Sequence, residues 1–308
     1  MKGQIRQFKP VNPVYGLLHK TIDEALEQLD ATRPILDESI HNARKSMKNS
    51  RAELRLLREG MPGVAYQTEN TRLRDAGRAL SPIRDARSVI DAFNSLRNNF
   101  AKELEGVDVA PLEEILHSKL AKARSQLQLD MPDQSAQLQN CNHLLEDCLS
   151  LAKKEHFSSI DSVVIHSGVQ RIYRKGRNAF AQAKAERTTE VLHECRKQAK
   201  YLFNGLNVLV IATPNGNSKA LKHARRLAER LGDDHELAML SEQISADDYV
   251  SVNAETIKVF RKLIEQRRAK LQNDSLKVGE KLYQQKPREF TKKVMQDVVL
   301  PSRNLRQI

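Results

Sequence analysis

One short pattern occurs twice in this chain and constrains its fold more than any other feature. The pattern H-x-x-R-K-x-x-K begins at His41 and again at His193, which is 152 residues later in a chain of 308. Residues at offsets 0, 3, 4 and 7 share one face of an α-helix, because each residue advances by about 100°. Each copy therefore predicts a helix with a histidine and three cations in one stripe. A repeat of this kind predicts two helical bundles related by a pseudo-twofold axis.

The composition predicts an all-α protein. Ala, Leu, Glu, Lys, Arg and Gln dominate, the chain has only 12 Gly, and runs of β-branched residues are rare. These residues favour the helix, and the apolar residues recur at helical spacing along most of the chain. A length of 308 residues allows one large domain or two of ordinary size, with a hydrophobic core that needs no disulfides.

Helix breakers and the repeat together divide the chain into four parts. Each half contains one helix, then the helix with the H-x-x-R-K-x-x-K stripe, then a further basic helix. The sequence over 213–217 is the clearest loop. We expect this division: a first helical bundle over 14–104, connector helices over 105–158, a second bundle over 159–270, and a C-terminal tail with short helices over 271–308.

Each half also contains a predicted helix break that includes aspartate. The first break ends in Arg84-Asp85, and the second lies at Leu231-Gly-Asp-Asp234. Aspartate often caps helices or orients nearby arginines. We expect Asp85 and Asp234 to play such roles rather than to act as general bases.

The charge distribution favours a polyanionic partner. The net charge is +12 and the isoelectric point is near 9.6, so the mean field attracts polyanions. Between His41 and Arg58, six Lys or Arg accompany a single acid, Glu53. An ordinary solvated helix face mixes both signs, with Glu four residues before Lys or Arg. Because this compensation is missing, we interpret the stripes as a polyanion-binding site rather than as solvated surface.

The candidate binding residues come from four basic stripes, two in each half. We expect the stripes to converge if the two bundles pair through their basic faces. Arg suits phosphate because its planar guanidinium binds two oxygens at once, whereas Lys adds a point charge. The candidate residues are His41, Arg44, Lys45, Lys48, Arg51, Arg55, Arg72, Arg78, Arg171, Arg174, Lys175, His193, Arg196, Lys197, Lys200, Lys222, Arg225 and Arg226.

The sequence offers little support for catalysis or metal binding. It has no P-loop, G-x-G-x-x-G, H-E-x-x-H or G-x-S-x-G motif, and no ordered aspartate pair that would bind magnesium. No carboxylate or cysteine lies three or four residues after His41, and the adjacent cations disfavour a metal ion. We therefore expect no metal, no cofactor and no enzymatic activity. The two motif histidines are expected to donate to phosphate or to anchor their helices to the core.

The cysteines and the hydropathy of the chain predict where in the cell the protein is located. The three cysteines, Cys141, Cys148 and Cys195, form no C-x-x-C motif, which predicts free and mostly buried thiols in a reducing compartment. The longest apolar run spans only 208–212, so we expect no membrane span. The first residues lack the apolar stretch of a signal peptide. Together these features predict a cytoplasmic protein.

The duplicated motif, the Arg-rich helix after it and the aspartate breaks resemble the CHAD family, the conserved histidine α-helical domain. The resemblance covers about residues 8–290. It implies two pseudo-symmetric four-helix bundles with a basic cavity or pore between them, and it places both motifs at the binding surface. Members of that family bind inorganic polyphosphate, and several are associated with polyphosphate granules. The family's frequent companion, a triphosphate-tunnel enzyme domain, has no room here, so we expect a stand-alone member.

The resulting hypothesis is a non-catalytic module that binds long-chain inorganic polyphosphate in the cytoplasm, at polyphosphate granules. The main alternative is a helical protein that binds RNA or DNA through the same basic faces. The absence of Trp and the 5% aromatic content disfavour it, because single-strand binders stack bases on rings. Phosphate attraction alone still predicts weak, salt-sensitive affinity for nucleic acid. A polyphosphate-processing enzyme and a structural scaffold are weaker alternatives.

Overall fold

The computed structural model describes residues 13–32, 34–130, 133, 135–152, 162–212, 219–244 and 252–296. The predicted loop over 213–217 lies outside these residues. The helices are α1 (Pro13–Gln28), α2 (Asp37–Leu57), the 3-10 turn η1 (Arg58–Gly60), α3 (Gly63–Ala79), α4 (Ser81–Asn99), α5 (Ala110–Gln126), α6 (Ala136–Ala152), α7 (Ser162–Ala185), α8 (Thr189–Ala212), α9 (Lys219–Gln243), α10 (Ala254–Leu282) and α11 (Pro287–Gln296).

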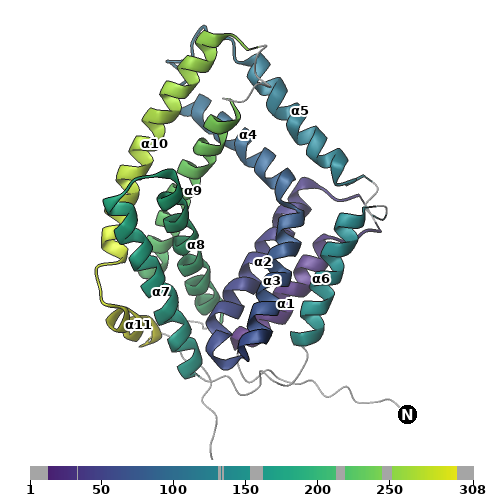
Figure 1. Cartoon of the computed structure of the whole chain (residues 1–308), viewed down its shortest axis with the longest axis vertical. Coiled ribbons are helices and arrows are strands. Elements are labelled where there is room, and N and C mark those ends of the chain that lie inside the picture. The colour runs from purple at the N-terminus through teal and green to yellow at the C-terminus, as the bar shows by residue number, and fades with distance from the viewer. Residues whose placement is uncertain are drawn as a thin grey trace, which may run out of the picture.

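The predicted all-α class is confirmed, since the described residues contain helices and no strand. Helices α1, α2, α3 and α6 pack together as one group, and α7 to α11 form a second group (Figure 1). Helices α4 and α5 join the groups at the top of the view, where α4 packs on α9. Among the described helices, none combines the length and the apolar character of a membrane span.

The motif helices α2 and α8 contact each other where the two groups meet. Helix α6 lies within the range expected to connect the bundles, but it packs on α1 and α3 as the fourth helix of the first group. The pseudo-twofold axis and the boundaries of the four parts stay predictions. What the packing does establish is that the two repeated motifs face a common junction.

Helix α2 shows why its cations face this junction. Ile40, Ala43 and Met47 of α2 are buried in the hydrophobic core. Glu53 is also buried, and it accepts a hydrogen bond from Thr21 Oγ1 of α1 at 2.7 Å. Burial raises the Glu53 pKa to about 8, which favours the neutral carboxyl at neutral pH. The single acid of the first basic segment therefore points into the core and leaves the cationic face uncompensated.

The helix break predicted at Leu231-Gly-Asp-Asp234 is wrong. Helix α9 continues through it from Lys219 to Gln243. Glycine in a helix interior costs only about 1 kcal/mol, which packing easily offsets. Here Gly232 is buried, and the buried Asp234 accepts hydrogen bonds from Arg268 Nε and Gln272 Nε2, each at 3.0 Å. Asp234 thus orients an arginine of α10, one of the two roles expected for it.

Helix α10 is also longer than expected. The basic amphipathic pattern predicted a helix over 255–270, whereas α10 extends to Leu282. Leu271 and Ser275 are buried along the extension, so packing against neighbouring helices continues past the strongly basic part. The tail predicted after 270 therefore begins inside a long helix and continues with α11.

Helices α2 and α7 approach so closely at Gly168 that we expect Gly168→Ala to destabilise the protein. An added Cβ would lie 2.6 Å from the carbonyl oxygen and 2.9 Å from the Cα of Leu56, so backbone would have to move. Such overpacking typically costs about 1–3 kcal/mol. Gly232→Ala is the matched control, because nothing lies within 4 Å of its added Cβ. Thermal unfolding should show a lower Tm for Gly168→Ala and an equal or higher Tm for Gly232→Ala. Equal Tm values would contradict the close approach.

Candidate functional site

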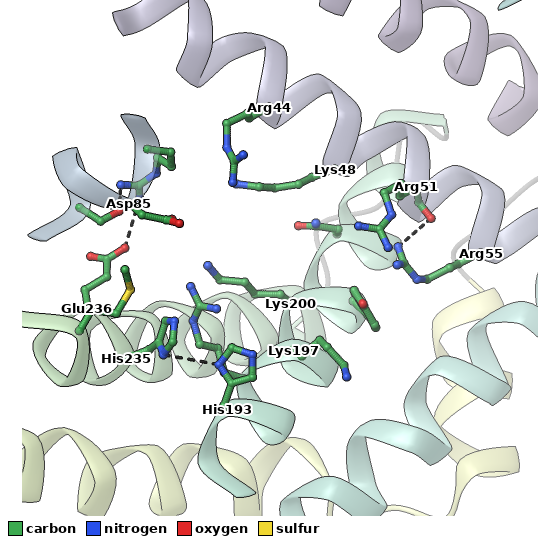
Figure 2. Close-up of a pocket in the computed structure, with 16 residues that line it drawn as sticks. Arg44, Lys48, Arg51, Arg55, Asp85, His193, Lys197, Lys200, His235 and Glu236 are labelled. Carbon is green, nitrogen blue, oxygen red and sulfur yellow. Dashed lines mark hydrogen bonds and ion pairs between the residues drawn. The ribbon is translucent and has the colours of Figure 1, made fainter. Parts of the chain in front are cut away.

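A cavity of about 260 Å³ lies where α2, α4, α8 and α9 meet. Eight Lys or Arg side chains line it, against two carboxylates (Figure 2). A concave site with one sign of charge focuses the potential and concentrates counter-ions. The lining residues are Arg44, Lys48, Arg51, Arg55, Arg84, Asp85, Ser88, His193, Arg196, Lys197, Lys200, Tyr201, Asn204, His235, Glu236 and Met239.

Four cations of α2 line the cavity because they follow the helical period. Arg44, Lys48, Arg51 and Arg55 lie at offsets 0, 4, 7 and 11, which share one face. Arg51 Nε donates to Asn70 Oδ1 at 3.1 Å, which holds its guanidinium toward α3. Arg55 donates to the Arg51 carbonyl at 2.8 Å. This part of the site is thus held in place by hydrogen bonds before any ligand binds.

Helix α8 supplies the opposite wall. Its motif residues Arg196 and Lys200 line the cavity, and Lys200 lies across from Arg44 and Lys48 (Figure 2). Further along α8, the Tyr201 ring lies under the guanidinium of Arg55, with 3.7 Å between the guanidinium carbon and the ring centroid. This cation–π contact joins the two motif helices at one end of the cavity.

Two equivalent arginines carry unused hydrogen-bond donors. The Nε atoms of Arg44 and Arg196 are buried and have no hydrogen-bond partner among the described residues. These residues occupy the same position in the two motif copies. Arg44 is otherwise held by Nη1, which donates to the Gly77 carbonyl and to Ser81 Oγ, the latter at 3.0 Å. Buried polar groups are nearly always paired, so these two donors are available for a hydrogen bond to a bound group.

Two lysines face each other across the cavity with strongly lowered pKa values. Desolvation by surrounding protein is the largest cause for both, although Lys48 is an exposed residue, so solvent screening weakens the effect on it more than on the half-buried Lys200. Neighbouring cations, Arg196 among them, add to the effect for both lysines, and the charge of Lys48 further lowers the pKa of Lys200. The pKa of Lys48 falls to about 8 and that of Lys200 to about 7. An anion bound between them would relieve this repulsion.

The two carboxylates of the cavity come from the end formed by α4 and α9. Arg84 Nη2 donates to Glu236 Oε1 at 3.2 Å, and Arg84 Nη1 also donates to Ser88 Oγ. Asp85 is exposed beside them. Arg84, Glu236 and His235 line the cavity but were not among the residues predicted from the sequence to bind a ligand. One signal was present, because Glu236 follows Arg84 by 152 residues, the same separation as the two motifs.

The two motif histidines have different surroundings. His193 lines the cavity, and its Nδ1 lies 3.5 Å from Nδ1 of His235 on α9. His41 is exposed and lies outside the cavity lining. Burial and nearby cations lower the pKa of each, and that of His235 falls to about 4. Among the described residues, no group of three or more His, Cys, Asp or Glu could hold a metal ion.

Two candidate cations outside the cavity form ion pairs that stabilise the fold. Arg72 pairs with Glu69 at 2.7 Å and with Asp147 of α6 at 3.1 Å. Arg171 binds Glu59 at 2.8 Å and donates to the Arg55 carbonyl at 2.5 Å, which fixes α7 against α2. The remaining candidates are exposed away from the cavity: Lys45, Arg78, Arg174, Lys175, Lys222, Arg225 and Arg226. Whether any of these contacts a ligand stays a prediction.

The three cysteines are free and buried, as the sequence analysis predicted. Burial raises the pKa of Cys141 and of Cys195 to about 12, which keeps both thiols protonated at neutral pH. The pKa of Cys148 is raised as well, with burial as the main cause. The cysteines therefore act as core residues and contribute nothing to the cavity.

The chain was compared with known protein families and with curated proteins. No curated protein matches the chain. The CHAD domain family matches residues 17–245, which include both motifs and every residue of the cavity lining. This match covers well over half of the 308 residues. The chain therefore belongs to the CHAD domain family.

Proposed function

We propose that this protein binds long-chain inorganic polyphosphate in the cavity between α2 and α8. The observation that supports the proposal most directly is the pair of unpartnered buried donors on Arg44 and Arg196. Between them, Lys48 and Lys200 face each other with lowered pKa values. Such an arrangement disfavours the empty state and is stabilised by an anion with several charges. A chain of identical phosphates suits it, because each cation can contact a phosphate without reading any other feature.

The proposed function is binding alone, with no reaction catalysed on the bound polyphosphate. Glu236 is engaged by Arg84, and Asp85 lies within electrostatic reach of Arg44 and Arg196. Carboxylates in such surroundings are poor ligands for the magnesium ions that phosphoryl-transfer enzymes use. We also propose a cytoplasmic location at polyphosphate granules, where such a module would find its ligand.

The cavity favours polyphosphate over nucleic acid. Among the described lining residues, Tyr201 is the phenol ring, and the guanidinium of Arg55 covers one of its faces. A base would have to displace this arginine before it could stack on that face. Nucleic acid can still be attracted by the net charge, but that attraction is sensitive to salt.

A competition titration tests the proposal. Labelled long-chain polyphosphate is bound to the protein at about 0.15 M salt, where surface attraction is screened over about 8 Å. The complex is then challenged with single-stranded DNA, duplex RNA and ATP. We expect excess nucleic acid or ATP to leave polyphosphate bound. Equal displacement by DNA or RNA at matched phosphate concentration would overturn the proposal in favour of nucleic-acid binding.

A further inference from the structure

Glu236 is the best-connected anion of the cavity. Its carboxylate accepts a hydrogen bond from Arg84 of α4 at 3.2 Å. It also lies within electrostatic reach of Lys48 on α2 and of Arg196 and Lys200 on α8, whose pKa values it raises. A single carboxylate from α9 thus attracts cations from three other helices. Its place among them is the place that a phosphate would take.

The distribution of charge along the cavity is uneven. Glu236 and Asp85 lie at the end formed by α4 and α9, whereas Arg51 and Arg55 lie at the other end (Figure 2). The two arginines lie beside Tyr201, and none of the described residues that line the cavity there is a carboxylate. A short phosphate drawn to the centre of the cation cluster must compete with Glu236 for the same cations. A long chain can in addition occupy the end that lacks carboxylates.

We propose that Glu236 is an internal counter-anion that makes the cavity selective for long polyphosphate over short phosphates. This inference rests on the proposed function. A like charge beside a binding site costs affinity unless further contacts offset it. A tripolyphosphate has few such contacts, and a long chain has many. Glu236 therefore acts as a specificity-determining residue, not as a ligand-binding one.

The test compares Glu236→Gln with Glu229→Gln by measuring Kd for tripolyphosphate and for long-chain polyphosphate. Glu229 also lies on α9 and pairs with Arg225 outside the cavity, so both variants change the net charge equally. We expect Glu236→Gln to tighten tripolyphosphate binding by about 10-fold, which equals about 1.4 kcal/mol. Long-chain binding should tighten by less than about 3-fold. Glu229→Gln should change neither value by as much.

Two results would overturn the inference. One is an equal gain in affinity for both ligands in Glu236→Gln. The other is an unchanged or lower affinity for tripolyphosphate, which would mean that Glu236 only holds Arg84 in position. Glu236→Asp is the conservative variant that keeps the charge, and its ratio of the two Kd values should stay close to that of the unaltered protein. If the unaltered protein binds neither ligand, the proposed function itself fails. If it binds the long chain but the ratio does not respond to Glu236→Gln, only this inference fails.

Discussion

Replacing Lys48 and Lys200 together by glutamate should lower the affinity for long-chain polyphosphate by at least about 100-fold without lowering Tm. A hydrogen bond to a charged group contributes about 1.5–3 kcal/mol, so two of them account for a change of this size. Within the described part of the chain, neither ammonium group has a hydrogen bond or an ion pair, so no native contact is lost. The substitution also removes repulsion from Arg44 and Arg196. Stability should therefore stay equal or rise while binding is lost.

The matched control is Lys45→Glu with Lys222→Glu. Both residues are exposed and outside the cavity, and the change in net charge is the same. Titration with polyphosphate at constant salt and thermal unfolding of the free proteins give the two readouts. We expect the control to keep most of the affinity. If it loses as much affinity as the cavity variant, binding follows the net charge and the cavity is not the site.

Helical phase explains how far the sequence could identify this site. At about 100° per residue, Arg44, Lys48, Arg51 and Arg55 fall within roughly 60° of one another on α2. Lys45 falls about 100° away from Arg44, on the flank of the stripe. The four lie in the cavity and Lys45 does not, although Lys197, which occupies the position of Lys45 in the second motif, does line it. The pattern of the motif was right, but one helix can present only part of a broad stripe to a narrow cavity.

Other candidates could not be sorted by sequence because their partners lie far along the chain. Arg72 and Arg171 looked like ligand-binding cations until their carboxylates were located: Asp147 lies on α6 and Glu59 on η1. An arginine that pairs with a distant carboxylate has no local signature in sequence. Composition showed a large excess of cations but could not show which of them the fold itself neutralises.

The same limit applies to the second aspartate break, whereas the first does separate α3 from α4. A glycine followed by two aspartates suggested an end to the helix, but the buried pair of Asp234 and Arg268 lets α9 continue. Continuity of α9 is what brings His235 and Glu236 into the cavity. The repeat still contained useful information, since the separation of 152 residues joins Arg84 to Glu236. The same separation did not bring His41 and His193 together, because His193 lies beside His235 and His41 lies outside the cavity lining.

The affinity for long-chain polyphosphate should fall by about 10-fold or more as pH rises from about 6 to about 9. Lys200 has a pKa of about 7 and Lys48 of about 8 in the free protein, so both lose their charge over this range. A bound phosphate chain favours the charged ammonium groups and raises both pKa values. Binding is therefore coupled to proton uptake, and the sign of the linkage requires weaker binding at higher pH.

Calorimetry in buffers of different ionisation enthalpy measures this uptake directly. At about pH 7.5 we expect the protein to take up as many as about one proton per cavity from the buffer when polyphosphate binds. Lys200 is then mostly neutral and Lys48 mostly charged in the free protein. Uptake should shrink at about pH 6, where both lysines are already protonated. A constant value across the pH range would contradict a titrating lysine pair.

Arginine at both positions separates the lysines from every other titrating group. The variant with Lys48→Arg and Lys200→Arg keeps two positive charges at any pH used here, since guanidinium does not lose its proton. It should still bind polyphosphate, with a flat affinity between about pH 6 and about pH 9 and no proton uptake. The lowered pKa values of His193 and His235 leave both rings neutral in the upper part of this range, so the slope above about pH 8 is the part that tests the lysines. A variant that retained the original slope would place the linked proton elsewhere and would remove the lysine pair from the account of binding.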